Sequence, residues 1–139
     1  MREKMQKQMP LVNPATDHPQ VRELEAISAI LKKHPTICQL VHQDLSNGKI
    51  TAARSGARGM SAEQVLRAAL VKALFGFTYQ QLAFHMVDSR ALRRFCLIGF
   101  ADKGFKKSVL NKTIKALSAT TWEQINRTLL AQIFIHINF

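Results

Sequence analysis

Hydrophobic residues recur at intervals of three and four along most of this chain, which is the spacing of an amphipathic α-helix. The first such run covers residues 20–47 and predicts a pair of helices, because Pro35 interrupts the pattern and Gly48 ends it. Residues 1–19 contain three prolines and little periodicity, so we expect a flexible leader there. Residues 48–60 are basic and contain glycine, which predicts a linker or mobile loop.

Two capping boxes mark the starts of consecutive helices in the middle of the chain. Ser61 pairs with Gln64, and Thr78 pairs with Gln81, at the three-residue spacing that such boxes require. Gly76 lies between them and is suited to end the first helix. The pattern therefore predicts two short helices divided by a glycine, with Leu74 among the inward residues of the first.

The rest of the chain predicts three more helices and an unusual tail. Asp88 or Ser89 can cap a short helix that runs from Arg90 to about Cys96. A further helix begins at Ser108, and Thr120 and Thr121 offer overlapping capping boxes for the last one. Residues 133–139 alternate and have high β propensity, so we expect them to depart from the helix. The predicted fold is all-α, a small bundle of short helices in which residues 61–132 form the main domain.

The charge of the chain is strongly unbalanced and changes the range of expected partners. The 139 residues suffice for one domain, and 20 Lys and Arg face 9 Asp and Glu, a formal charge of +11. Such an excess favours a polyanionic partner, above all nucleic acid. A membrane partner is disfavoured because no run of 18 apolar residues occurs. The polar N-terminus resembles no signal peptide, so a cytoplasmic location is expected.

Residues 78–95 have the rhythm of a helix-turn-helix unit. A capped first helix is followed by a polar turn at Asp88-Ser89 and by a helix rich in arginine. In such a unit the second helix lies in the major groove, where the fork of arginine can bind guanine. The competing interpretation is that these helices only pack a core and that the arginines form a solvated face. That alternative explains the capping but not the concentration of charge.

Eight cations and only two carboxylates lie between Met86 and Lys115, and a polyanion nearby would relieve their mutual repulsion. We assign the arginines to base reading and the four lysines around the start of the following helix to phosphate contacts. The basic residues Arg54 and Arg58 could reach a groove as an arm, or could belong to a plain tether. The predicted DNA-binding residues are Arg90, Arg93, Arg94, Lys103, Lys106, Lys107, Lys112 and Lys115.

Other groupings of reactive side chains predict no catalytic residue, metal site or cofactor. One histidine–cysteine group has four-residue spacing and could suit zinc, but Pro35 breaks the helix and a fourth ligand is missing. Three carboxylates match a two-metal site in number, yet each has a local role at a helix start or in a loop. The two cysteines are expected to be buried free thiols. The groups are His34, Cys38 and His42 for zinc, and Asp88, Asp102 and Glu123 for the carboxylates.

From Met60 to about Gln132 the sequence resembles a known family. The residues that carry the resemblance are SAEQVLRAALVKALFGFTYQQLAFHMVDSRALRRFCLIGF and then GFKKSVLNKTIKALSATTWEQINRTLLAQ. They are similar to the N-terminal helical region of bacterial insertion-sequence transposases of the DDE type. Within that type they look like the ISNCY elements and relatives that share an InsH-like N-terminal domain.

The resemblance implies a role in recognising the terminal inverted repeats of an insertion sequence. In such transposases a following RNase-H-like domain holds three carboxylates and two Mg²⁺ ions, so we expect a truncated chain that binds double-stranded DNA without cutting it. Its partners would include a second copy or a full-length transposase. Two alternatives stay open: a free-standing regulator or nucleoid-type protein that binds DNA, and an unstable relic without function.

Overall fold

The computed structural model describes residues 19–48 and 59–137, with the backbone alone for residues 132–137. The described residues form seven α-helices and no strand, which confirms the predicted all-α fold. The predicted leader, residues 49–58 of the predicted linker with Arg54 and Arg58, and the last two residues lie outside this description. The helices are α2 (Pro19–Lys33), α3 (Pro35–Asn47), α4 (Ala62–Phe75), α5 (Tyr79–Asp88), α6 (Arg90–Phe95), α7 (Lys107–Lys115) and α8 (Ala119–Ile137).

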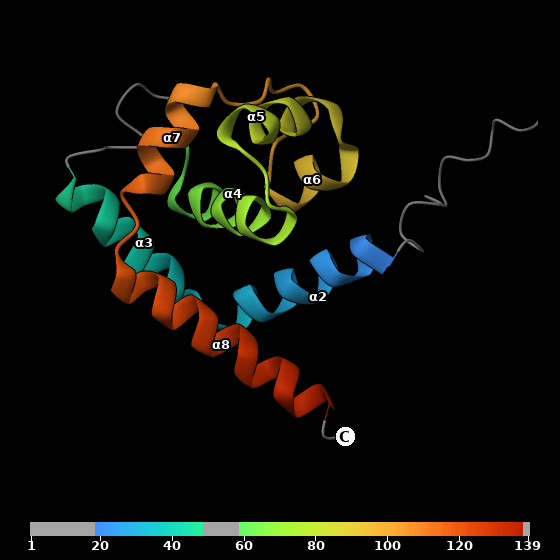
Figure 1. Cartoon of the computed structure of the whole chain (residues 1–139), viewed down its shortest axis with the longest axis vertical. Helices are drawn as coiled ribbons and strands as arrows, with labels where there is room; N and C mark the ends of the chain where they lie inside the picture. Colours follow the sequence, from blue (N-terminus) through green and yellow to red (C-terminus); the bar gives the residue numbers. More distant parts are fainter. Residues whose placement is uncertain (1–18, 49–58, 138–139) are drawn as a thin grey trace, which may run out of the picture.

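Helix α4 is the centre of the molecule, with α3, α5 and α7 packed around it (Figure 1). All seven residues from Val65 to Val71 are buried, because a helix surrounded by others has no solvent face. Helical periodicity therefore does not identify its inward residues. Leu74, expected inward, is 53% exposed, whereas the side chain of Arg67 is completely buried.

The N-terminal helical pair shares one core with the later helices. Hydrophobic side chains of α2 and α3 lie in the same buried cluster as those of α4 to α8. Asp44 on α3 also holds the start of α8, because its carboxylate accepts hydrogen bonds from the Ser118 amide at 2.9 Å and from the Thr121 hydroxyl. The cap of α8 is Ser118, whose Oγ accepts from the Thr121 amide, and not the predicted Thr120 or Thr121.

The corner between α4 and α5 is built as predicted. Both capping boxes are present, with Ser61 and Gln64 at the start of α4 and Thr78 and Gln81 at the start of α5. Gly76 ends α4 in the left-handed conformation at φ +67°, where a side chain would be strained. Helix α7 packs against both helices, so α4, α5 and α7 form a unit of three mutually touching helices.

The last helix is longer than predicted. Helix α8 continues to Ile137 and does not change into an extended tail near residue 133. No proline or glycine interrupts the chain after Gly104. Adding a residue to an existing helix costs little compared with starting one, so a run of residues with β propensity does not stop it.

The buried Arg67 joins three helices. Its guanidinium donates hydrogen bonds to the Ser28 hydroxyl on α2 at 2.9 Å and to the Phe95 carbonyl on α6 at 3.0 Å. It also pairs with Glu63 one turn earlier on α4, at 3.2 Å, and lies 5.0 Å from the centre of the Phe95 ring. A buried charge is tolerated only when it is paired and hydrogen-bonded, and Arg67 meets both conditions.

We expect Arg67→Ala to lower the free energy of unfolding by about 3 kcal/mol or more. The change leaves a cavity and removes the donor for the buried Phe95 carbonyl. Urea unfolding followed by circular dichroism measures the effect.

Arg127→Ala is the matched control, because Glu123 and Arg127 form the same four-residue pair on α8 with both side chains more than 60% exposed. Its expected cost is about 0.5 kcal/mol or less. Equal destabilisation by the two substitutions would contradict the assigned role of Arg67.

Candidate nucleic-acid interface

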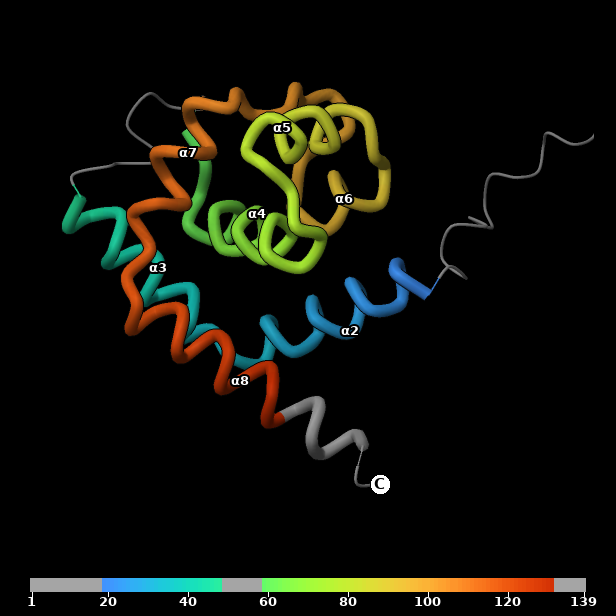
Figure 2. Tube along the Cα trace, viewed as in Figure 1, coloured from blue at the N-terminus to red at the C-terminus, as the bar shows by residue number. Residues whose placement is uncertain are grey.

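The predicted DNA-binding cations lie on α6, on the loop of residues 96–106 and on α7. Figure 2 shows this segment passing over the end of the molecule opposite the outer half of α8. All are exposed except Arg93, which is half-buried. None of them forms an ion pair with a carboxylate of the described residues, unlike Arg67 and Arg127, which pair with Glu63 and Glu123. The positive charge at this end is therefore not neutralised by those acids.

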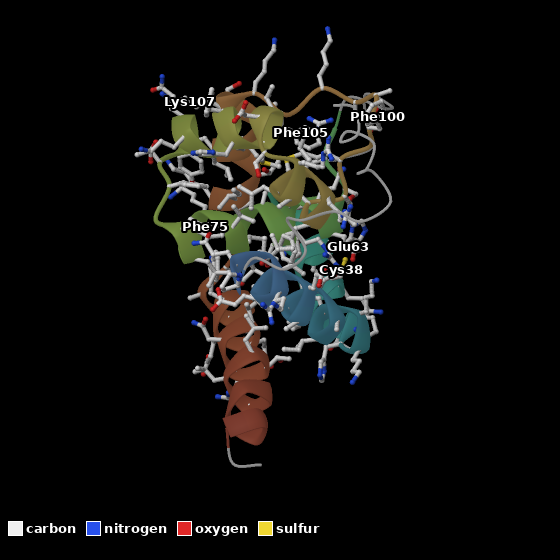
Figure 3. The ribbon with its side chains drawn as sticks, turned by 90° about the vertical axis from the view of Figure 1, so that its right-hand side faces the viewer. Cys38, Glu63, Phe75, Phe100, Phe105 and Lys107 are labelled. Carbon is white, nitrogen blue, oxygen red and sulfur yellow. The ribbon has the colours of Figure 1, made fainter. Side chains whose placement is uncertain are left out.

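The structure divides these cations into two groups. Arg90 and Arg94 project from α6, which packs on α5 and α2, and they line a groove between α6 and α2. Lys103 and Lys106 line a separate depression beside the start of α7, which also packs on α5. Figure 1 shows α6 and α7 on opposite sides of α5. Figure 3 shows Lys107 at the same end of the molecule as Phe100 and Phe105. Helix α5 thus lies between an arginine group and a lysine group that includes Lys112 and Lys115 further along α7.

Arg93 has a structural role that the sequence pattern did not reveal. Its guanidinium donates hydrogen bonds to the carbonyls of Met86 at 3.0 Å, Gly99 at 2.8 Å and Asp102. These bonds tie α6 to the end of α5 and to the following loop. Arg93, predicted to read bases, thus has its guanidinium directed at the protein backbone. Helical spacing cannot predict hydrogen bonds to carbonyls on the following loop. The sequence pattern therefore grouped Arg93 with Arg90 and Arg94.

The corner between α5 and α6 lacks the turn expected of the predicted helix-turn-helix. Ser89 alone separates the helices, and its Oγ accepts from the Leu92 amide at 3.2 Å. Helix α6 has six residues and ends at Phe95. Two residues later, Leu97 is left-handed at φ +61° although it has a side chain. The glycine-containing turn of three residues lies instead between α4 and α5. On α5, Gln80, Phe84 and Val87 form an exposed face.

Among the reactive side chains considered for chemistry, two carboxylates make local contacts and both thiols have raised pKa values. Burial raises the pKa of the Cys96 thiol to about 12, and burial also raises the pKa of Cys38, so both thiols stay protonated at neutral pH. Asp102 accepts a hydrogen bond from the Gly99 amide, and Glu123 pairs with Arg127. Within residues 19–48 and 59–131 no three side chains of the ligating types are grouped as a metal site would require.

The comparison with protein families identifies the chain. A family described as "Transposase domain (DUF772)" matches residues 13–116, which is most of the sequence. The chain belongs to this transposase family. No curated protein and no solved structure matches it. The finer assignments to the DDE type and to ISNCY or InsH-like relatives stay predictions.

The matched region of this transposase-family chain extends the resemblance seen in the sequence. It begins well before Met60 and includes α2 and α3, in agreement with the core that these helices share with α4 to α7. It also covers every predicted DNA-binding cation from Arg90 to Lys115. No described helix is long and apolar enough to cross a membrane.

We expect Arg93→Ala to lower the free energy of unfolding by about 1–2 kcal/mol, because three carbonyls lose a charged donor. Amide exchange at Ile98 and Asp102 should accelerate, since the loop loses its tie to α5. Arg94→Ala on the same helix is the control and should change stability by less than about 0.5 kcal/mol. Unchanged loop exchange in Arg93→Ala would show that the arginine does not hold the loop.

Proposed function

We propose that this transposase-family chain binds double-stranded DNA through its α6–α7 end. The observation that carries the proposal is the group of exposed cations on α6, the loop and α7, none of which is paired with an acid in the described residues. Lys and Arg on such a surface displace condensed counterions from a phosphate backbone, which supplies the driving force. Membership of a transposase family supports a role for such binding in transposition.

The start of α7 suits phosphate. Lys106 stands at the cap without a side-chain hydrogen bond, and the first turn contains no acidic residue. The first amides of a helix lack partners within the helix and favour an anion, whereas cations there are unfavourable without one. Lys106 and Lys107 at this position are stabilised by a bound phosphate, which the helix amides also attract.

We assign the reading of bases to α5. In helix-turn-helix units two helices are joined by a short turn that often contains glycine, and the first residues of the second helix meet base edges. The α4–α5 pair has this turn at Gly76, and Gln80 is exposed in the first turn of α5. A glutamine side chain can bind adenine through two hydrogen bonds. The alternative is that α6 contacts the bases through Arg90 and Arg94.

The proposed target is the terminal inverted repeat of an insertion sequence, bound by one or more copies alone or together with a full-length transposase. A nucleoid-type or regulatory role is the alternative, and membership of a transposase family favours the first. DNA binding would place the chain on the nucleoid. We also propose that the described residues cut no DNA, since Asp102 and Glu123 are engaged in local contacts.

The binding proposal predicts a steep dependence of affinity on salt for any duplex, and replacing Lys106 and Lys107 together by alanine should reduce the salt slope by about two. Fluorescence anisotropy with a mixed-sequence duplex at several salt concentrations measures the slope. The control removes the same charge elsewhere, through Lys33→Ala with Arg127→Ala on α2 and α8. Equal slopes for the two double variants would leave only the net charge as the cause.

Specificity is tested by comparing the mixed-sequence duplex with a duplex that carries any inverted repeat found beside the gene. We expect Gln80→Ala to reduce the preference for the repeat about tenfold or more while leaving mixed-sequence binding intact. Arg94→Ala tests the alternative that α6 reads the bases. A loss of preference in Arg94→Ala alone would assign base reading to α6, and equal affinity of the unaltered protein for both duplexes would contradict specific recognition.

The absence of cleavage is tested with an end-labelled repeat duplex incubated with Mg²⁺ or Mn²⁺. We expect no strand nicking above the level without protein. Nicking that is abolished by Asp102→Asn or Glu123→Gln would show that these carboxylates have a catalytic role after all.

A further inference from the structure

Phe100 is the most exposed large hydrophobic residue in the described part of the chain, with a relative exposure of 103%. It lies on the turn from Gly99 to Asp102, between α6 and α7. Figure 3 shows it at the outer edge of the molecule, at the end that also carries Lys107. An aromatic ring that is this exposed gains little packing energy in the free protein, so it is available to a partner.

The turn that carries Phe100 is held by its own hydrogen bonds, by Arg93 and by close packing of Gly104 on α5. The Asp102 amide donates to the Gly99 carbonyl at 3.0 Å, and the Asp102 carboxylate accepts from the Gly99 amide at 3.1 Å. Arg93 donates to the carbonyls of Gly99 and Asp102. Gly104 lies so close to α5 that a Cβ there would come within 3.0 Å of Val87. The ring is therefore presented by an ordered turn.

The surroundings of Phe100 combine apolar and cationic groups. Leu97 and Val87, both exposed, line the same shallow depression as Phe100, together with Arg90 and Arg94. Lys103 follows three residues later along the chain, and Asp88 is the acid of this depression. Duplex DNA offers flat apolar base surfaces between two anionic strands, which is the complement of a protruding ring flanked by cations.

We propose that Phe100 is a wedge that inserts between neighbouring base pairs of bound DNA and kinks the duplex. Apolar side chains act in this way in proteins that bend DNA, where the cost of unstacking is offset by the added contact with the protein. Arg90, Arg94 and Lys103 hold the phosphates on either side of the opened step. The inference rests on the proposed DNA binding and adds to it a deformation that charge alone does not produce.

The test compares two fluorescein-labelled duplexes of mixed sequence, one fully paired and one with a central two-base bulge that is already partly unstacked. The unaltered protein should bind the bulged duplex about tenfold more tightly, because base stacking on an aromatic ring is strong and the cost of opening is reduced. Phe100→Ala should bring this preference to about twofold or less. Phe100→Leu should keep most of it, since leucine can also act as a wedge.

Leu130→Ala is the control, because it removes another exposed hydrophobic side chain, on α8, and should keep the preference intact. Circular dichroism verifies that each variant is folded. If Phe100→Ala binds both duplexes as the unaltered protein does, the wedge is refuted while the DNA binding stands. If the unaltered protein binds neither duplex at low salt, the proposed function fails as well. A change in oligomeric state on sedimentation without a change in preference would make Phe100 a protein contact instead.

Discussion

The buried guanidinium of Arg67 is the constraint on which the rest of the structure depends. It lies on the central helix α4 and joins Ser28 on α2 to the Phe95 carbonyl at the end of α6. A charge in a core must find partners, and these partners can be supplied only if α2 and α6 approach α4 in one arrangement. The apolar contacts around α4 are less directional, because hydrophobic burial depends on area and not on orientation. Arg67 thereby contributes specificity to a core that is otherwise made of exchangeable aliphatic side chains.

A second arginine, Arg93, also fixes the chain by donating hydrogen bonds to backbone carbonyls, closer to the surface. Arg67 fixes the end of α6 by donating to the Phe95 carbonyl, and Arg93 fixes the loop that follows α6 by donating to backbone carbonyls. Between these two anchors the chain adopts a left-handed conformation at Leu97, which a residue with a side chain adopts only at a cost. The anchors stabilise that conformation, and with it the direction in which the loop leaves α6. The exposed loop is thus an extension of the core and not an independent segment.

The sequence predicted the parts of the fold that depend on local chemistry. Capping boxes at Ser61 and Thr78 and the stop at Gly76 are confirmed, because a cap depends on residues within one turn of the helix. The failures lie where neighbours distant in sequence decide. Arg67 is buried because the middle of α4 is enclosed by helices that its own periodicity cannot show, and Leu74 near the end of α4 is exposed although it fits the periodic pattern. Arg93 differs from Arg94 only through its carbonyl acceptors, most of which lie on the following loop, so residue type and spacing could not separate them.

The position of α5 between the two cationic groups bears on which helix would enter a groove. An α-helix with its side chains is about as wide as the major groove, so a helix in that groove has a phosphate strand on each side. Helix α5 has α6 with Arg90 and Arg94 on one side and α7, which begins after Lys106, on the other (Figure 1). If α6 entered the groove instead, its six residues would have α5 and α2 as neighbours, and the lysines of α7 would lie beyond α5. The distribution of charge therefore favours α5, even though α6 carries more arginine. In this arrangement the cations hold the strands and a nearly uncharged helix faces the bases, which separates affinity from sequence reading.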